Sequence, residues 1–182
     1  MEPMNNPSRI TTPEDLFKYI ESLGIQTSTV THRAVFTVAE GEDVKATIPG
    51  AHSKNLFVKD KKGRLFLITA KDYTQINLKK THETIGASGR LSFCSEDQMK
   101  EYLGVLPGSV TPLAIVNDTG KKVTMILDAK LMEHEHINCH PLINTMTTTL
   151  SRSDLLHFLS ATGHEPQIVE LPEPPAADRA EN

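Results

Sequence analysis

A lysine at the start of an apolar strand is the first candidate for chemistry. Residues 50–57 read GAHSKNLF, and the run that follows Lys54 is apolar and β-prone. Because successive side chains of a strand point to opposite faces, Lys54 shares a face with Leu56 and Val58, whereas Asn55 lies on the other. Lys54 therefore begins a face whose other members look buried, where its ammonium could meet a ligand. A lysine that extends to the edge of the sheet is the alternative.

The segment 134–140, with the sequence HEHINCH, holds the densest group of polar side chains. Histidine and cysteine are zinc ligands, but neither the helical His-x-x-x-His spacing nor paired Cys-x-x-Cys motifs are present. On a strand, His134 and His136 share one face and could reach one ion, while His140 follows beyond Cys139. Further ligands for a tetrahedral site are not evident, so we expect no metal, and exposed strand histidines explain His134 and His136 better.

The stretch LPGSVTP at residues 106–112 predicts a stiff loop. Two prolines fix φ on either side of Gly108, whose backbone groups can approach a ligand closely. A Gly-x-Ser-x-Gly elbow and a glycine-rich phosphate loop are both missing from the sequence, and Cys139 lacks the contexts of catalytic cysteines. Covalent catalysis by a side chain is therefore unsupported.

The elements that must position these residues mix helices with hairpins. Capping residues and apolar periodicity predict helices over 12–23, 37–48, 77–85, 95–103 and 151–162. Strands are expected over 29–32, 55–59, 64–69, 109–116, 122–127, 134–138 and 167–171. Turn residues at 60–63 and 117–120 join two pairs of strands into hairpins. This mixture favours an α+β domain over a doubly wound parallel sheet.

Length and composition favour one cytoplasmic domain. The chain has 182 residues, of which 38% are hydrophobic and 23% charged, and its two cysteines suit a reducing compartment. No apolar run approaches the roughly 20 residues that cross a bilayer, and the first ten residues lack the features of a signal peptide, so we expect no membrane association. We expect a flexible N-terminus over 1–9, the domain over 10–171 and a disordered acidic tail over 172–182.

The charge is unevenly distributed. The formal net charge is −4, but residues 45–80 hold nine basic side chains against Asp60 and Asp72, a local charge of +7. An acidic protein is a poor partner for nucleic acid, whereas a basic stretch can face RNA. A solvated, lysine-rich surface is the alternative interpretation.

Several of these segments, in this order, resemble the family of prolyl-tRNA editing domains, and in particular the freestanding alanyl-tRNA(Pro) deacylases. The matching stretches are HRAVFTV at 32–38, GAHSKNLF at 50–57, KKGRLFL at 61–67, GVLPGSVTP at 104–112, NCHPLINT at 138–145, LLHFL at 155–159 and GHEP at 163–166. The resemblance spans residues from about 10 to 171. It implies an α+β domain with a curved, mostly antiparallel mixed sheet and flanking helices.

By motif position, the resemblance assigns roles to individual residues. Lys54 looks like the family's essential lysine and is the expected catalytic residue. Substrate-binding roles are implied for Asn55, His140, Gly108, Ser109 and Asn144. The basic residues expected to meet the tRNA are Lys59, Lys61, Lys62, Arg64, Lys79 and Lys80. The sequence departs from the family at Cys139, where an aromatic residue is common in relatives, which leaves the pocket shape open.

The implied reaction is hydrolysis of alanine from the acceptor end of tRNA(Pro), without metal or cofactor. A prolyl site cannot strongly reject the smaller alanine, because each missing methylene costs only about 1–3 kcal/mol, so a second sieve is needed. The partners implied are tRNA(Pro) and, transiently, prolyl-tRNA synthetase. Two alternatives stay open: deacylation of cysteinyl-tRNA(Pro), and a module that binds tRNA or a synthetase without hydrolysis.

Overall fold

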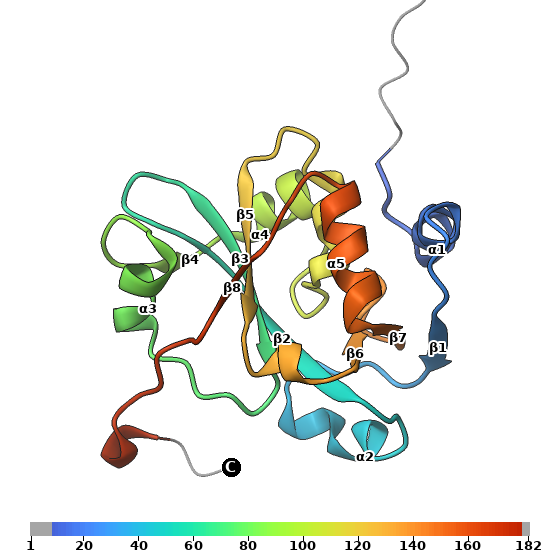
Figure 1. The fold of residues 1–182 in the computed structure, drawn as a ribbon, viewed down its shortest axis with the longest axis horizontal. Coiled ribbons are helices and arrows are strands. Elements are labelled where there is room, and N and C mark those ends of the chain that lie inside the picture. Colours follow the sequence, from blue (N-terminus) through green and yellow to red (C-terminus); the bar gives the residue numbers. More distant parts are fainter. Residues whose placement is uncertain (1–8, 180–182) are drawn as a thin grey trace, which may run out of the picture.

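The computed structural model describes residues 9–179, which form one curved mixed sheet flanked by helices (Figure 1). Four strand pairs are antiparallel and three are parallel within this part of the chain. The eight strands are β1 (Ser28–Thr31), β2 (Ala51–Lys59), β3 (Leu65–Lys71), β4 (Ser92–Phe93), β5 (Val123–Asp128), β6 (His136–Cys139), β7 (Met146–Ser151) and β8 (Gln167–Val169). The helices are α1 (Pro13–Ser22), α2 (Glu42–Lys45), α3 (Leu78–Ile85), α4 (Glu96–Gln98) and α5 (Arg152–Ala161). The predicted α+β class is confirmed.

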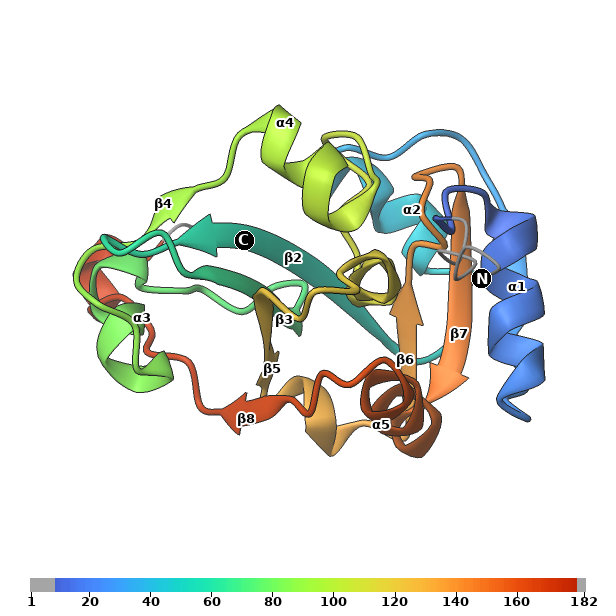
Figure 2. The same cartoon turned by 90° about the horizontal axis from the view of Figure 1, so that it is seen from above.

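Strand β2 joins the two halves of the sheet. Its first two residues pair in parallel with β6, and the residues from Ser53 to Lys59 pair antiparallel with β3. Figure 2 shows β2 as a long bent ribbon that runs from β6 towards β4. Gly50 begins this crossing with a φ of +102°, and a Cβ there would lie 3.0 Å from the His136 carbonyl oxygen. Glycine therefore allows β2 to start tightly against β6.

Both faces of the central hairpin are covered. Phe57 belongs to the larger core, which includes buried residues of α1 and α5, whereas Val58 packs in a smaller core with Ile85 of α3. Neighbouring residues of β2 are thus buried on opposite faces, which is the alternation expected from the sequence. Lys54 lies on the Val58 face, in register with Ala70 of β3.

The second predicted hairpin is wrong. Residues 109–116 do not form a strand; a 3₁₀ helix runs over Pro112–Asn117, with the Thr111 hydroxyl accepting from the Leu113 amide. Pro112 has no N–H for a sheet ladder but suits the first turn of a helix. Leu113, Ala114 and Ile115 are fully buried, so the apolar run that suggested a strand is a buried helical turn. Strand β5 pairs in parallel with β3 instead.

Strand β7 was missed. It pairs with β6 on one side and with β1 on the other, so it connects the N-terminal strand to the sheet. Its sequence, MTTTLS, contains three β-branched threonines, which is the signal that could have predicted it.

The predicted helices are present, with differences in the second and fourth. Thr12, Ser95 and Ser151 cap α1, α4 and α5, and α4 continues into a π-helical turn over Met99–Leu103. The predicted helix over 37–48 is shorter, with a 3₁₀ turn at Ala39–Gly41 followed by the single turn of α2.

Parts of both predicted termini lie against the domain. Pro172 accepts a hydrogen bond from the Asn77 amide, Glu173 pairs with Lys130, and Arg9 donates to the Lys100 carbonyl. Residues 1–8 and 180–182, which belong to the predicted flexible N-terminus and disordered tail, lie outside the described residues.

Candidate active site

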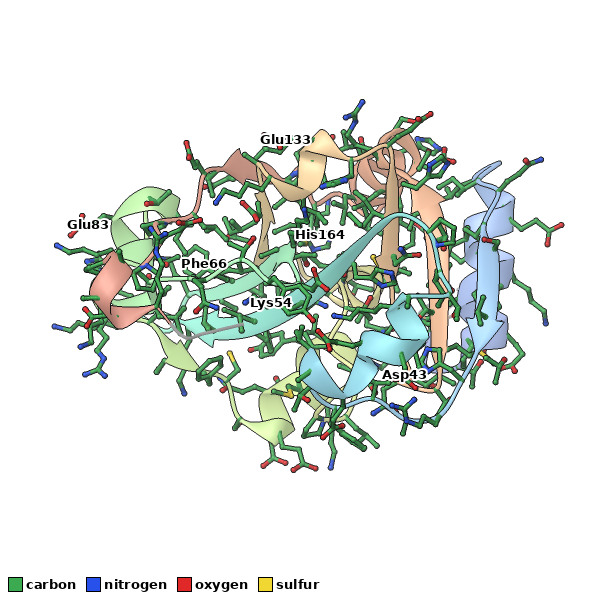
Figure 3. The ribbon with its side chains drawn as sticks, turned by 90° about the horizontal axis from the view of Figure 1, so that it is seen from below. Asp43, Lys54, Phe66, Glu83, Glu133 and His164 are labelled. Atoms are coloured by element: carbon green, nitrogen blue, oxygen red, sulfur yellow. The ribbon has the colours of Figure 1, made fainter. Side chains whose placement is uncertain are left out.

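A cavity of about 340 Å³ opens where β2 leaves β6. Its walls come from β2, from the end of β6, from the loop around Gly108 and from residues 33–48, a segment here called the strap. The lining includes His32, Val35, Phe36, Lys45, His52, Lys54, Asn55, Asp72, Phe93, Gly108, Asn138 and His140. Figure 3 shows Lys54 on β2 beside the α2 turn that carries Asp43. Segments far apart in the sequence thus meet around one cavity.

Lys54 is half-buried in this cavity. Burial lowers the pKa of its ammonium, and the carboxylates of Asp72 and Asp128 offset part of that effect. No hydrogen bond or ion pair within the described residues holds its Nζ, so the charge is available to a ligand. Of the two alternatives for Lys54, the structure has the side chain in the cavity lining.

Asp72, whose carboxylate acts on the charge of Lys54, is already paired. Asp72 Oδ2 lies 2.7 Å from Lys45 Nζ, and both side chains are largely buried. The Asp72 backbone N–H donates to the His52 carbonyl, which fixes the end of β3 to β2. Sequence reasoning overlooked Asp72, although an acid inside the basic stretch 45–80 was a usable signal.

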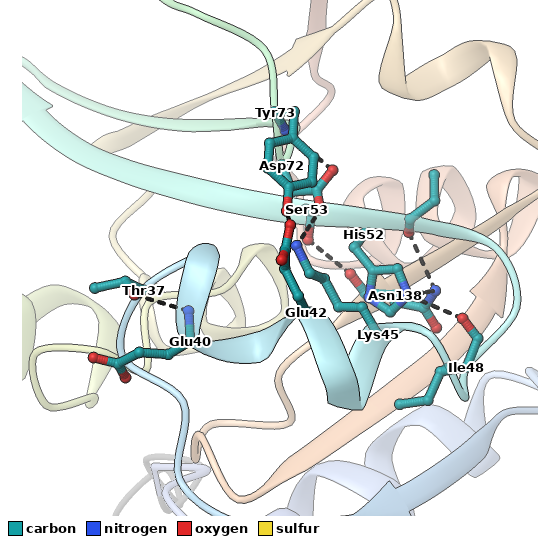
Figure 4. A network of polar contacts seen from close by, with 11 residues as sticks. Thr37, Glu40, Glu42, Lys45, Ile48, His52, Ser53, Asp72, Tyr73 and Asn138 are labelled. Carbon is teal, nitrogen blue, oxygen red and sulfur yellow. Dashed lines mark hydrogen bonds and ion pairs between the residues drawn. The ribbon is translucent and has the colours of Figure 1, made fainter. Parts of the chain in front are cut away.

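The same ion pair ties the strap to the sheet (Figure 4). The Tyr73 hydroxyl donates to Glu42, and Lys45 Nζ lies 4.4 Å from the centre of the Tyr73 ring. Within the strap, Arg33 forms a bidentate ion pair with Asp43, with both N–O distances 2.8 Å. These contacts hold the single turn of α2 over the cavity.

Asn55 is oriented from the opposite strand. Its Oδ1 accepts a 2.6 Å hydrogen bond from the hydroxyl of the fully buried Thr69. Since the amide oxygen is used, the amide nitrogen of Asn55 is the group left for a ligand. Asn55 therefore lies beside Lys54 in the cavity lining.

His140 presents an unprotonated nitrogen to the cavity. Its Nδ1–H donates to the Met146 carbonyl at 2.9 Å, which leaves Nε2 as an acceptor. Burial lowers the pKa of His140; the bond to Met146 opposes this, and nearby His32 and His52 lower it further. The imidazole is therefore neutral near pH 7.

Gly108 lines the cavity, but its predicted partners lie behind it. Ser109 is buried and bonds through its amide to the Leu106 carbonyl, outside the cavity lining. Asn144 also lies outside the lining, and its side chain donates to the Val35 carbonyl of the strap. Both residues support the walls of the cavity in this structure.

Neither Cys139 nor Ser53 is poised as a nucleophile. Burial raises the pKa of the Cys139 thiol to about 12. The Ser53 hydroxyl donates to the Asn138 carbonyl at 2.7 Å, so its proton is committed to the backbone. Asn138 is buried in turn and donates to the Pro49 carbonyl, which secures the start of β2.

None of the six basic residues predicted to contact tRNA is in the cavity lining. Lys59 is five residues along β2 from Lys54, roughly 17 Å at ~3.3 Å per residue. Lys61 and Lys62 are exposed in the following turn, and Lys79 and Lys80 are exposed in α3 at the same end of the molecule. Arg64 is already paired with the buried carboxylate of Asp60 at 2.8 Å.

No group of three or more histidine, cysteine or acidic side chains within residues 9–179 is arranged to hold a metal ion. His134 and His136 lie before and at the start of β6, outside the cavity lining. In the same part of the chain, none of the helices is long and apolar enough to cross a membrane.

Comparison with known proteins identifies the fold and the family. Residues 32–158, which contain Lys54, Asn55, Gly108 and His140, match the model of the aminoacyl-tRNA editing domain. The chain belongs to the aminoacyl-tRNA editing domain family. The predicted resemblance is therefore confirmed.

Relatives of this editing domain come from animals and bacteria. A zebrafish (Danio rerio) protein named prolyl-tRNA synthetase associated domain-containing protein 1 is 38% identical over 87% of this chain and 86% of its own. The prolyl-tRNA editing protein ProX of Acetoanaerobium sticklandii is 33% identical over 84% of this chain and 93% of its own. A solved structure described as a candidate trans-editing enzyme for prolyl tRNA synthetase has the same fold, with a TM-score of 0.66 at 18% identity, over 88% of this chain and 98% of its own.

Proposed function

We propose that this editing domain acts as a freestanding deacylase that hydrolyses alanine from the acceptor end of mischarged tRNA(Pro). The observation that carries the proposal is an unpaired, half-buried lysine beside an oriented amide and a neutral imidazole in one cavity. The family match and the name of the bacterial ProX relative support the choice of substrate class.

The site's chemistry suits an ester that is already activated. Hydrolysis of an aminoacyl ester needs a positioned water and a group that stabilises the developing negative charge on the carbonyl oxygen. The positive ammonium of Lys54 can stabilise that negative charge, and a low local dielectric strengthens the interaction. Alternatively, Lys54 holds the terminal phosphate or ribose.

Asn55 and His140 offer opposite hydrogen-bonding groups. The amide nitrogen of Asn55 can donate to the carbonyl or to a ribose hydroxyl, whereas Nε2 of His140 can accept from the substrate's ammonium or from the attacking water. Because Ser53 and Cys139 are committed to structural roles, we propose that water attacks the ester directly.

The experiment charges tRNA(Pro) separately with alanine, cysteine and proline and follows the loss of each ester. We expect alanine to be released selectively by the wild-type protein and not by Lys54→Ala. Faster loss of cysteine would assign the chain to cysteinyl-tRNA(Pro) deacylation. Binding of tRNA without hydrolysis of any ester would contradict the proposal and favour the binding-module alternative. Transient contact with prolyl-tRNA synthetase is tested separately by pull-down.

A further inference from the structure

Two phenylalanines at the mouth of the cavity are exposed to solvent. Phe36 is 65% exposed and Phe93 is 59% exposed, although both line the cavity. Most large apolar side chains of the described residues are buried in the two cores. An exposed apolar group beside a pocket indicates a surface that something covers.

The backbone beneath each ring is held in place. Phe36 lies in the strap, where its amide donates to Glu40, and a Cβ on Gly108 would come within 2.9 Å of the Phe36 ring. Phe93 lies in β4, paired with Val58 of β2, and the next amide, of Cys94, donates to the Phe57 carbonyl. Each ring is therefore presented by an anchored segment, Phe36 by the strap and Phe93 by β4.

Basic side chains lie on the hairpin side of Phe93 and favour a polyanion there over an apolar partner, whereas Glu96 and Asp97 are exposed on the α4 side. Ser92, the other residue of β4, lies opposite Lys59 of β2 in the sheet register. Arg90 is exposed two residues before Ser92. The side chain of Lys61 lies against Gly89 in the same loop, since a Cβ there would meet its Cδ at 2.7 Å. A chain of phosphates that passes Phe93 would thus run from the cavity towards the basic end of the hairpin.

We propose that Phe36 and Phe93 stack on the unpaired bases at the 3′ end of the tRNA and so seat the aminoacylated nucleotide over Lys54. Every base has an aromatic face, and stacking on protein aromatics needs no particular base sequence. This inference rests on the proposed function, because it takes the aminoacylated end of a tRNA as the occupant of the cavity.

The kinetic test compares full alanyl-tRNA(Pro) with the alanyl ester of adenosine, which lacks the preceding nucleotides. Loss of one stacked base corresponds to about 5- to 100-fold in affinity. We expect Phe36→Ala and Phe93→Ala to lower kcat/KM on the tRNA by this factor, mainly through KM, and to lower it on the minimal ester at least fivefold less. Leucine at either position should behave like alanine, whereas tyrosine should restore activity. Equal losses on both substrates, or full activity of the leucine variants, would overturn the inference.

A binding test separates this inference from the proposed function. The chain contains no tryptophan, so Phe36→Trp and Phe93→Trp each introduce one tryptophan that can be excited selectively over the three tyrosines. We expect uncharged tRNA(Pro) to quench both, and to leave unchanged the control Ile168→Trp, which is exposed on β8. Quenching without hydrolysis of any ester by the wild type would refute the proposed deacylase and retain the RNA surface. A response to prolyl-tRNA synthetase alone, with none to tRNA, would overturn it in favour of a protein-docking surface.

Discussion

The ammonium of Lys54 is half-buried and, among the described residues, has no ion pair, so folding gains little from its charge. Burial of a charge without a partner costs free energy, and its lowered pKa expresses that cost. Lys45 presents a contrast, because its ammonium forms an ion pair with Asp72. The two lysines of one cavity therefore differ in what they contribute to stability and to ligand binding.

Replacing Lys54 by methionine should separate stability from activity. Methionine keeps the side-chain length and removes the unpaired charge, so we expect the free energy of unfolding to stay within about 1 kcal/mol of wild type or to rise. Deacylation should fall about 100-fold or more, the usual effect of removing one charge-stabilising group from an active site. Urea unfolding and kcat/KM on alanyl-tRNA(Pro) measure the two effects. A large loss of stability with little loss of activity would indicate a structural lysine instead.

His140 should give the reaction an acid limb. Its Nε2 accepts only while the imidazole is neutral, and burial lowers the pKa of His140 below the ordinary value of about 6.5. We expect kcat/KM to stay level as the pH falls from 7.5 to 6.5 and to decline below that as His140 gains a proton. Protonation also favours the unfolded chain, so stability from this group is lost over the same range. In His140→Gln the remaining activity should lack this limb; an unchanged pH profile in that variant would contradict the assignment.

Among the elements, the strap depends on a few polar contacts rather than on a core. Its single α-helical turn has no buried residue, and the described strap residues that are buried are Gly41 and Ile48. The ion pair between Lys45 and Asp72 is a largely buried contact of the strap with the residues that follow β3, whereas the bond between Tyr73 and Glu42 is exposed. Short elements with little apolar burial open more easily than the core.

Two of the polar links that hold the strap to the sheet can be removed separately. Lys45→Met leaves the buried carboxylate of Asp72 without its partner, and we expect a loss of about 1–3 kcal/mol in the free energy of unfolding. KM for alanyl-tRNA(Pro) should rise because the strap forms one wall of the cavity. Tyr73→Phe is the matched control, since it deletes only the exposed bond and should leave both quantities near wild type. Denaturant unfolding and steady-state kinetics compare the two variants. Equal effects of both would contradict the larger contribution expected from the Lys45–Asp72 ion pair.

Across the whole molecule, negative net charge and a basic hairpin end coexist. The turn that carries Lys61 and Lys62 is stabilised by Asp60, whose carboxylate accepts hydrogen bonds from the amides of Lys62, Arg64 and Ser88. Burial alone would raise the pKa of Asp60, but these bonds and the contact with the Arg64 side chain lower it to about 2. The turn is thus rigid while its lysines remain exposed, which suits an electrostatic contact with the acceptor stem.

Charge reversal at this end should weaken tRNA binding. We expect Lys61→Glu with Lys62→Glu to raise the Kd for tRNA(Pro) and to reduce the slope of log K against log salt by about 2, close to one unit for each phosphate that the protein no longer neutralises. The control, Lys18→Glu with Lys122→Glu, makes the same change in net charge at exposed positions in α1 and the 118–122 turn. Fluorescence anisotropy at several salt concentrations measures both variants. Equal binding by the two would place the tRNA elsewhere on the surface.

Sequence patterns determined the local elements and the central hairpin of this protein. Caps such as Ser95 and Ser151 and the turn at 60–63 act within a few residues, so their outcome can be read locally. Alternation along β2 likewise placed Lys54 on an inward face, and ordered motifs identified the family. The strand predicted over 109–116 failed because a buried apolar run looks the same in a strand and in a buried helical turn.

Tertiary structure alone decided which side chains share the cavity. The pairing of Lys45 with Asp72, the neutral tautomer of His140 and the exposure of Phe36 and Phe93 all depend on contacts between distant segments. Ser109 and Asn144 also could not be placed from the sequence. Their motifs are adjacent to the cavity, but both residues bond to the backbone of its walls. Local sequence specifies backbone conformation, but burial and electrostatics are set by what the fold brings alongside each residue.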